Sequence, residues 1–248
     1  AGETATQEIE IQVRNPNPYV TEVAEKVLQP GEEWTSDLLP VGVAGTNTGT
    51  LEISNIPPIN LGKRLQYLIR FPHGCVEQTT SAAFPQLHLS SVIDLNSNQQ
   101  KQISYNVKQA INKLGYYQKA NGGFSYWPGS GSVNDWGTTY AGHFIIEAEK
   151  AGYTVPISFK SNWIAYQKRV AKQWRYNDHN DLYQAYRLYT LAVAGAPDLS
   201  SMNRLRENSN LSNDSRLRLA ATYALVGQSK AAEELLKNST IDFQPSRY

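Results

Sequence analysis

Residues 71–81 read FPHGCVEQTTS and mark the point where a loop gives way to a helix. Cys75 and Gln78 stand three positions apart, directly after a Pro-His-Gly break, so on a first helical turn their side chains come together. A helix N-terminus also favours a thiolate, which makes Cys75 more nucleophilic than a free cysteine. Such a thiolate could displace ammonia from the carboxamide of Gln78 and leave a thioester. The stretch therefore predicts a reactive Cys–Gln pair at the start of a helix.

The spacing by itself leaves a second interpretation open, because a lone cysteine in a helix is often a small buried apolar residue. Cys75 is the single cysteine among 248 residues, which excludes an internal disulfide and a multi-cysteine metal site. The four histidines show no metal-ligand spacing, so the sequence predicts no metal and no cofactor. Cys75 is thus buried and inert, reactive, or modified.

The composition excludes two further classes of partner. The formal net charge is +1 with Lys and Arg scattered along the chain, which gives no electrostatic footprint for nucleic acid. No run of about 18 apolar residues occurs, so we expect no direct membrane insertion by this segment.

The first 58 residues carry the alternation that is typical of β-strands. Apolar and polar residues alternate at 8–13 and again at 49–53, and turn-forming Asn, Pro and Gly lie between these stretches. Three or four strands are too few for a closed sandwich. We therefore expect 1–58 to be part of a β module whose other strands lie elsewhere.

From about residue 57 the hydrophobic period changes to 3.6, so the fold is predicted to be mainly α. One helix is expected before the break at 71–74. Another follows Cys75 and is bent or divided at Pro85. Further helices are expected at about 99–114, 135–151, 158–175, 180–194, 199–208 and 214–238.

The later helices recur at intervals of roughly 30–45 residues, which is the range of helical-hairpin arrays. Three of them are closed by a glycine at the expected C′ position, namely Gly152, Gly195 and Gly227. Two architectures fit this pattern: an open solenoid of helix pairs, and the same pairs closed into an α/α toroid. The aromatic loop NGGFSYWPG at 121–129 favours closure, because its side chains suit the lining of a central or rim pocket.

The whole string from Pro72 to Ser81 resembles the thioester motif of the α2-macroglobulin and complement family, whose core is Gly-Cys-x-Glu-Gln. Residues 51–70 resemble the segment that leads into the thioester domain of bacterial α2-macroglobulin-like proteins. Two later stretches, GGFSYWPG at 122–129 and DWGTTY at 135–140, resemble that domain in order and spacing. Because these matches occur in order, the chain is identified as a fragment of a bacterial α2-macroglobulin-like protein that contains the thioester domain.

The resemblance implies a fold and an activity. The family's thioester domain is an α/α toroid inserted into a CUB-type β module, so we expect a partial CUB-like segment at 1–58 and the thioester domain at 59–248. We expect the ring to be incomplete, because the sequence stops at 242–248 without the last helices that a complete toroid would need. The implied function is a broad-spectrum protease inhibitor, a single-use covalent trap and not a turnover enzyme. Its Cys75–Gln78 thioester would acylate amines or hydroxyls of the target.

The resemblance also implies partners and a location. In the family, a protease cleaves a bait region elsewhere in the molecule, and the resulting rearrangement exposes the thioester. Target proteases and other domains of the same parent chain are therefore the expected partners. Bacterial relatives are mostly periplasmic and often lipid-anchored, which implies the periplasm or cell envelope for this protein.

Neighbours of the pair are candidates for supporting roles. Gly74 matches the motif and suits a backbone conformation that larger residues resist. Glu77 also matches the motif and is either favourably placed in the positive first turn or simply solvated. A hydrolysable bond needs an apolar lid, and Phe124, Tyr126 and Trp127 are the candidates for it, with ordinary core packing as the alternative for each.

A histidine distant in sequence first takes the acyl group in some complement relatives, which frees the thiolate to act as a base. His179 lies in roughly that part of the order and His73 is closer in sequence, although a surface or packing role is the simpler interpretation of both. Without such a histidine, transfer to amines is favoured over transfer to hydroxyls. Two rival functions stay open: a cysteine enzyme that uses Cys75 with His143 or His179 as base, and a helical scaffold that has lost the bond.

Overall fold

The computed structural model describes residues 2, 7–8, 20–37, 39–51, 53, 65–176, 180–237 and 239. The chain divides into two units, Ala1–Pro58 and Ile59–Tyr248. In the first unit the described residues are mostly exposed and include turns at 30–31 and 44–45, with no strand among them. The expected strand at 8–13 falls largely outside the described residues. Of the strand expected at 49–53, residues 49–51 and 53 are described and form no strand. The CUB-like β segment therefore stays a prediction.

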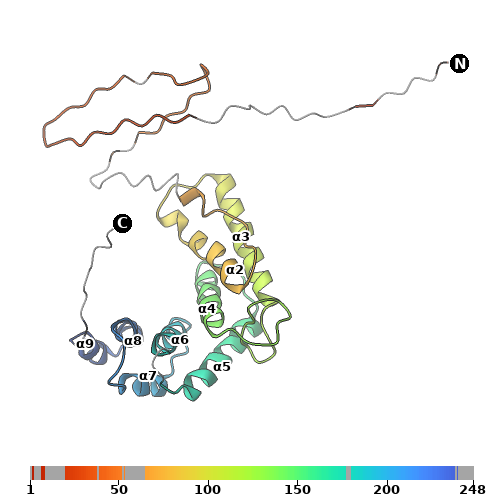
Figure 1. Cartoon of the computed structure of the whole chain (residues 1–248), viewed down its shortest axis with the longest axis vertical. Coiled ribbons are helices and arrows are strands. Elements are labelled where there is room, and N and C mark those ends of the chain that lie inside the picture. Colours follow the sequence, from red (N-terminus) through yellow and green to blue (C-terminus); the bar gives the residue numbers. More distant parts are fainter. Residues whose placement is uncertain are drawn as a thin grey trace. The chain divides into compact units, whose positions relative to one another are not determined.

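The second unit is built from α-helices joined by short connections (Figure 1). In chain order they are α2 (Val76–Ala83), α3 (Ser97–Gly115), α4 (Asp135–Lys150), α5 (Ile157–Gln173), α6 (Asp181–Val193), α7 (Leu199–Arg206), α8 (Asn213–Leu225) and α9 (Ser229–Lys237). Two 3₁₀ turns, Pro85–Leu87 and Leu89–Ser91, lie between α2 and α3. The predicted mainly α fold is confirmed for the described part of the chain. None of the described helices is long and apolar enough to cross a membrane.

The helices pack in two rows. α2, α4, α6 and α8 contact one another in succession, while α3, α5 and α7 pack along one side of that row (Figure 1). Each helix of the second row contacts the two neighbouring helices of the first, as α5 does with α4 and α6. This alternation is what a row of helical hairpins produces, and both a solenoid and a ring of hairpins contain it. Closure into an α/α toroid stays a prediction.

Apolar side chains fill the space between the rows in two clusters. The first joins residues of α2 to α5 and includes Val76, Phe124 and Trp163. The second joins residues from the end of α5 to α9 and includes Met202. Ile164 on α5 packs against both clusters, so the core continues along the rows. Removal of this apolar surface from water is the main stabilising contribution to the helix array.

Local sequence signals set several helix ends. Pro85 ends α2 and the chain continues as a 3₁₀ turn, because proline has no amide to donate and its ring clashes with the preceding turn. α3 begins at a capping box: Oδ1 of Asn96 accepts from the Gln99 amide at 3.0 Å, and Oε1 of Gln99 accepts from the Asn96 amide at 2.9 Å. Division of the helix at Pro85, expected from the sequence, is thus confirmed.

The expected glycine caps are also confirmed. Three helices end at glycines in the left-handed region, Gly152 (φ 89°), Gly195 (φ 71°) and Gly227 (φ 75°). After each glycine, the next amide donates to a carbonyl five residues back, as Gln228 does to Tyr223 at 2.9 Å, which is a Schellman cap. The cap at Gly227, which the sequence predicts, divides the helical stretch expected at 214–238 into α8 and α9.

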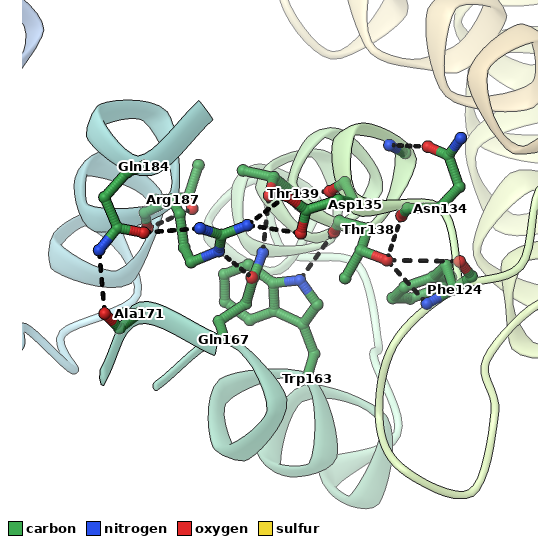
Figure 2. Close-up of polar contacts among 12 residues, drawn as sticks. Phe124, Asn134, Asp135, Thr138, Thr139, Trp163, Gln167, Ala171, Gln184 and Arg187 are labelled. Carbon is green, nitrogen blue, oxygen red and sulfur yellow. Dashed lines mark hydrogen bonds and ion pairs between the residues drawn. The ribbon is translucent and has the colours of Figure 1, made fainter. Parts of the chain in front are cut away.

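A buried arginine joins α4, α5 and α6 (Figure 2). Arg187 on α6 is 1% exposed, and its guanidinium donates to Oε1 of Gln167 at 3.0 Å and Oε1 of Gln184 at 2.6 Å. It also donates to both carboxylate oxygens of Asp135 at 2.5 Å each. Gln167 in turn donates to Oγ1 of Thr139 at 2.9 Å. Because Asp135 is the first residue of α4, this network fixes the start of α4 against α5 and α6.

Replacement of Arg187 by Met should destabilise the fold by about 2–4 kcal/mol, because it leaves two buried amide oxygens without donors and Asp135 without its partner. The loss of unfolding free energy should be smaller than the largest losses seen when buried ion pairs are broken, because the Asp135 side chain is 46% exposed. Arg70→Met is the matched control at an exposed arginine, with an expected change within about 0.5 kcal/mol. Urea unfolding followed by circular dichroism measures both. Equal unfolding free energies for the two variants would contradict the assignment.

Candidate functional site

Gly74 places Cys75 at the N-cap of α2. Its φ of +85° lies in the left-handed region, and Cys75 is extended with φ −71° and ψ 178°. A Cβ at position 74 would lie 1.9 Å from Oε1 of Gln78. Gly74 is therefore required for two reasons: the backbone conformation, and the space that Gln78 occupies.

Gln78 folds back onto the start of its own helix. Its Oε1 accepts a hydrogen bond from the Cys75 amide at 3.1 Å, and the two side chains form a capping box at the first turn. The Cys75 side chain is buried, at 2% exposure, whereas Gln78 is exposed. The structure thus brings the predicted pair together, with the thiol inside and the carboxamide facing outward.

The carbonyl of Gly74 is held by a buried tyrosine. Oη of Tyr117 donates to the Gly74 carbonyl at 2.5 Å, and Oγ1 of Thr79 donates to the same oxygen at 3.4 Å. Burial raises the pKa of Tyr117, which keeps its hydroxyl protonated as a donor. The sequence analysis missed both residues, because neither stands in a motif: Tyr117 lies 42 positions after Cys75, and only the packing of α3 on α2 reveals the contact.

The aromatic loop after α3 reaches the site through its backbone. The Val76 amide, one of the unpaired donors at the start of α2, donates to the carbonyl of Tyr126 at 3.1 Å. The loop is itself held on α4, where the Phe124 amide donates to Oγ1 of Thr138 at 2.9 Å and the Asn134 amide to the Phe124 carbonyl at 2.8 Å (Figure 2). Trp163 of α5 donates to the Thr138 carbonyl at 2.8 Å. Residues on three helices therefore position Tyr126.

The three aromatic residues proposed as a lid have different environments. Phe124 is buried in the core, where its ring packs edge-on against Phe159 at 5.4 Å between centroids. Tyr126 is 37% exposed and Trp127 is 51% exposed, with their rings edge-on at 5.8 Å. Among the three, Tyr126 is the residue whose side chain reaches the first turn of α2, where its hydroxyl contacts Glu77.

Glu77 is half-buried in the first turn of α2, where the helix dipole favours a negative charge. Its Oε2 accepts a hydrogen bond from Oη of Tyr126 at 3.5 Å. Hydrogen bonding to a Cys75 thiolate, followed by the negative charges of that thiolate and of Glu77, raises the pKa of Tyr126 to about 12. The Tyr126 side chain is thus a neutral hydrogen-bond donor at physiological pH.

The described histidines make no hydrogen bond to Cys75, Gln78 or Tyr126. His73 is exposed and its ring packs on Phe71 at 4.7 Å. His143 on α4 packs edge-on against Phe84, with Nδ1 3.0 Å from the Tyr186 hydroxyl. His179 lies outside the described residues, so its suggested role as an acyl carrier stays a prediction. Within the described part of the chain, no hydrogen bond links a histidine to Cys75.

A Cys–Gln pair held at a helix N-terminus within an array of helical hairpins is the site of a thioester-domain protein. The model of the A-macroglobulin TED domain matches residues 52–183, and the chain belongs to this family. An α2-macroglobulin of Escherichia coli is 34% identical over 154 residues, which cover 59% of this chain and 9% of the relative. One of Xylella fastidiosa is 26% identical over 202 residues, which cover 75% of this chain and 12% of the relative.

Solved structures support the same assignment. The crystal structure of a Salmonella α2-macroglobulin reacted with methylamine superimposes with a TM-score of 0.62 at 28% identity, covering 73% of this chain and 13% of that one. The chain therefore represents the thioester domain of a bacterial α2-macroglobulin. It spans about a tenth of the length of the curated relatives.

Gly74→Ala should lower the free energy of unfolding by about 2–3 kcal/mol, because its Cβ displaces Gln78 from the Cys75 amide in addition to straining the backbone. Gly129→Ala is the matched control: its φ is +77° and a Cβ there meets open space, so the strain alone applies, about 1 kcal/mol. Chemical denaturation of both variants measures the difference. Equal losses would show that Gln78 does not occupy the space beside Gly74.

His143 should make the fold less stable in acid. Burial lowers the pKa of His143 to about 4, whereas an unfolded histidine titrates near 6.5. Between these values the unfolded chain binds a proton that the folded chain does not, so the free energy of unfolding falls as the pH falls through this window. The expected contribution between pH 7 and pH 5 is about 2 kcal/mol.

The variant His143→Phe tests this contribution, since it keeps an aromatic ring among aromatic neighbours. Denaturation at pH 7 and pH 5 should show a smaller acid-induced loss in His143→Phe than in the wild type. His73→Phe, at an exposed histidine, is the control and should retain the wild-type difference. A wild-type acid response in His143→Phe would contradict the prediction.

Proposed function

We propose that Cys75 and Gln78 form an internal thioester, and that the chain is the acyl-transfer domain of a broad-spectrum protease inhibitor. The observation that carries the proposal is the capping box, in which the Gln78 carbonyl oxygen accepts from the Cys75 amide beside the Cys75 thiol. The family supports it, because the domain of the matching family model is a thioester domain.

The geometry suits formation of the bond. The Cys75 thiolate attacks Cδ of Gln78, and the carbonyl electrons move onto Oε1. As the carbonyl re-forms, the C–N bond breaks, and the amide nitrogen takes up the proton that the thiol has lost and leaves as ammonia. The hydrogen bond from the Cys75 amide to Oε1 stabilises the negative charge that develops on that oxygen. The N-terminus of α2 favours both the thiolate and the oxyanion.

The geometry also suits transfer of the acyl group outward. Because the sulfur is buried and Gln78 is exposed, a nucleophile reaches the acyl group from outside while the thiolate departs inward. A lysine amine of the target would become joined to Cδ of Gln78 by an amide bond. That bond is stable to water, so each molecule acts once, as a covalent trap.

Shielding of the thioester and completion of the domains would come from other parts of the full protein. Since Gln78 is exposed in this domain, other domains of the parent chain would have to shield the thioester until a protease cleaves a bait region. The two rows of helices would continue into the α/α toroid of the family, with 1–58 as part of the CUB-like module. From the resemblance to bacterial α2-macroglobulins we expect a location in the periplasm or cell envelope.

The cysteine-enzyme alternative is less well supported. A nucleophilic cysteine of that class needs a base within hydrogen-bond reach. His143 bonds to Tyr186, and within the described residues Cys75 has no histidine partner. A scaffold that has lost the bond would have no need for a glycine that leaves space for Gln78.

Intact mass tests the thioester. The full protein should be about 17 Da lighter than its sequence mass, because the condensation removes ammonia. Methylamine should restore one free thiol and add the mass of the amine at Gln78. Cys75→Ser and Gln78→Ala should show the sequence mass and release no thiol.

A protease challenge tests the trap. Incubation of the full protein with trypsin should give a covalent adduct on denaturing gels, absent in Gln78→Ala and after pretreatment with methylamine. A sequence mass together with a free Cys75 thiol in the untreated full protein would contradict the proposal.

A further inference from the structure

The hydroxyl of Tyr126 has two acceptors beside the reactive pair. The bond from the Val76 amide to the Tyr126 carbonyl, at 3.1 Å, fixes the residue against the first turn of α2. From there its Oη donates to Oε2 of Glu77 at 3.5 Å. The same hydroxyl lies near enough to Cys75 for a thiolate there to raise the pKa of Tyr126. One hydrogen thus faces a carboxylate and a sulfur.

The two acceptors change in relative strength during acyl transfer. The sulfur of a thioester is neutral and a weak acceptor, so before the reaction the carboxylate of Glu77 attracts the hydroxyl more strongly. When the acyl group leaves, the sulfur becomes a thiolate and a charged acceptor. A phenol titrates near pH 10, so Tyr126 keeps its proton before the reaction. Once the Cys75 thiolate forms, it raises the pKa of Tyr126 further, and the phenol acts as a donor only.

We propose that Tyr126 is a hydrogen-bond switch that turns its hydroxyl from Glu77 to the departing sulfur of Cys75 and so stabilises the thiolate. This inference rests on the proposed thioester and adds a catalytic residue to it. In the step, the lone pair of an amine forms a bond to Cδ of Gln78, and the C–S bond breaks with its electron pair going to Sγ. The extra proton of the amine passes to solvent, and the Tyr126 O–H bond stays intact.

The switch gives Tyr126 and Glu77 opposite effects on the rate. Without the phenolic hydroxyl, the thiolate loses a donor at the moment when its charge develops, and the reaction slows. Without the charge of Glu77, the hydroxyl is free to face the sulfur, and a like charge beside the thiolate disappears, so the reaction accelerates. A purely structural contact between the two residues would make both substitutions act in the same direction.

The experiment compares Tyr126→Phe and Glu77→Gln with the wild type in the full protein. Intact mass first establishes that the thioester is present in each. Release of the thiol by methylamine at fixed pH is then followed with a thiol reagent. We expect release of the thiol to be about tenfold slower in Tyr126→Phe than in the wild type. This is a small effect for the loss of one hydrogen-bond donor to a developing charge, because the site is partly exposed. Release should be faster in Glu77→Gln. Tyr116→Phe, at a highly exposed tyrosine next to the loop, should react like the wild type.

A second measurement separates stabilisation of the thiolate from packing. After complete reaction with methylamine, alkylation of Cys75 by iodoacetamide is measured as a function of pH. In Tyr126→Phe the pH of half-maximal alkylation should move upward, because the thiolate has lost its donor. A change in loop packing alone would alter the rate without moving this profile.

The outcomes are distinguishable. A wild-type protein with the full sequence mass overturns the thioester and this inference together. A wild-type thioester with unchanged release and an unchanged pH profile in Tyr126→Phe overturns the inference alone. Slower release in Glu77→Gln also contradicts the switch, as does a Tyr126→Phe protein that folds but carries no thioester.

Discussion

The backbone amides at the start of α2 have no acceptors within the helix. The groups that accept their hydrogen bonds determine which side chains meet at the site. The Cys75 amide takes its acceptor from Gln78, which brings the carboxamide back to the thiol. The Val76 amide takes its acceptor from Tyr126, which brings the aromatic loop and its hydroxyl to the same turn. One requirement of helix termini thus brings together Cys75 and Gln78, the proposed nucleophile and acyl donor, and the hydroxyl of Tyr126.

The loop that supplies Tyr126 contains only two isolated β-bridges, so its position depends on tertiary contacts. Thr138 on α4 bonds to Phe124, and Trp163 on α5 bonds to Thr138. The start of α4 is in turn fixed by the buried guanidinium of Arg187 on α6. Close packing of α4 on α2 adds to this, since a Cβ on Gly137 would meet Val76 at 2.6 Å. The rows of helices therefore serve as a rigid frame for one short turn.

The sequence predicted the elements better than their extent. Pro85 and the three C′ glycines act through their own backbones, so their effects on helix ends were readable locally. Gly227 marks the end of α8 in this way, whereas the helical pattern that resumes after it made 214–238 look like one continuous stretch. At the site, Cys75, Gln78 and Gly74 stand in one short motif, whereas Tyr117 and Thr79, which hold the Gly74 carbonyl, carry no motif.

By itself the sequence determined the helical class of the chain, the position of the reactive turn, and the spacing that lets Gln78 return to Cys75. These features depend on residues within one helical turn, whose geometry is the same in any helix. Only the tertiary structure decided that the Cys75 side chain is buried while Gln78 stays exposed, and that the Tyr126 hydroxyl donates to Glu77 while Phe124 lies in the core. Those features depend on contacts between segments about 50 residues apart, which only the packing of α3, α4 and α5 around the loop sets.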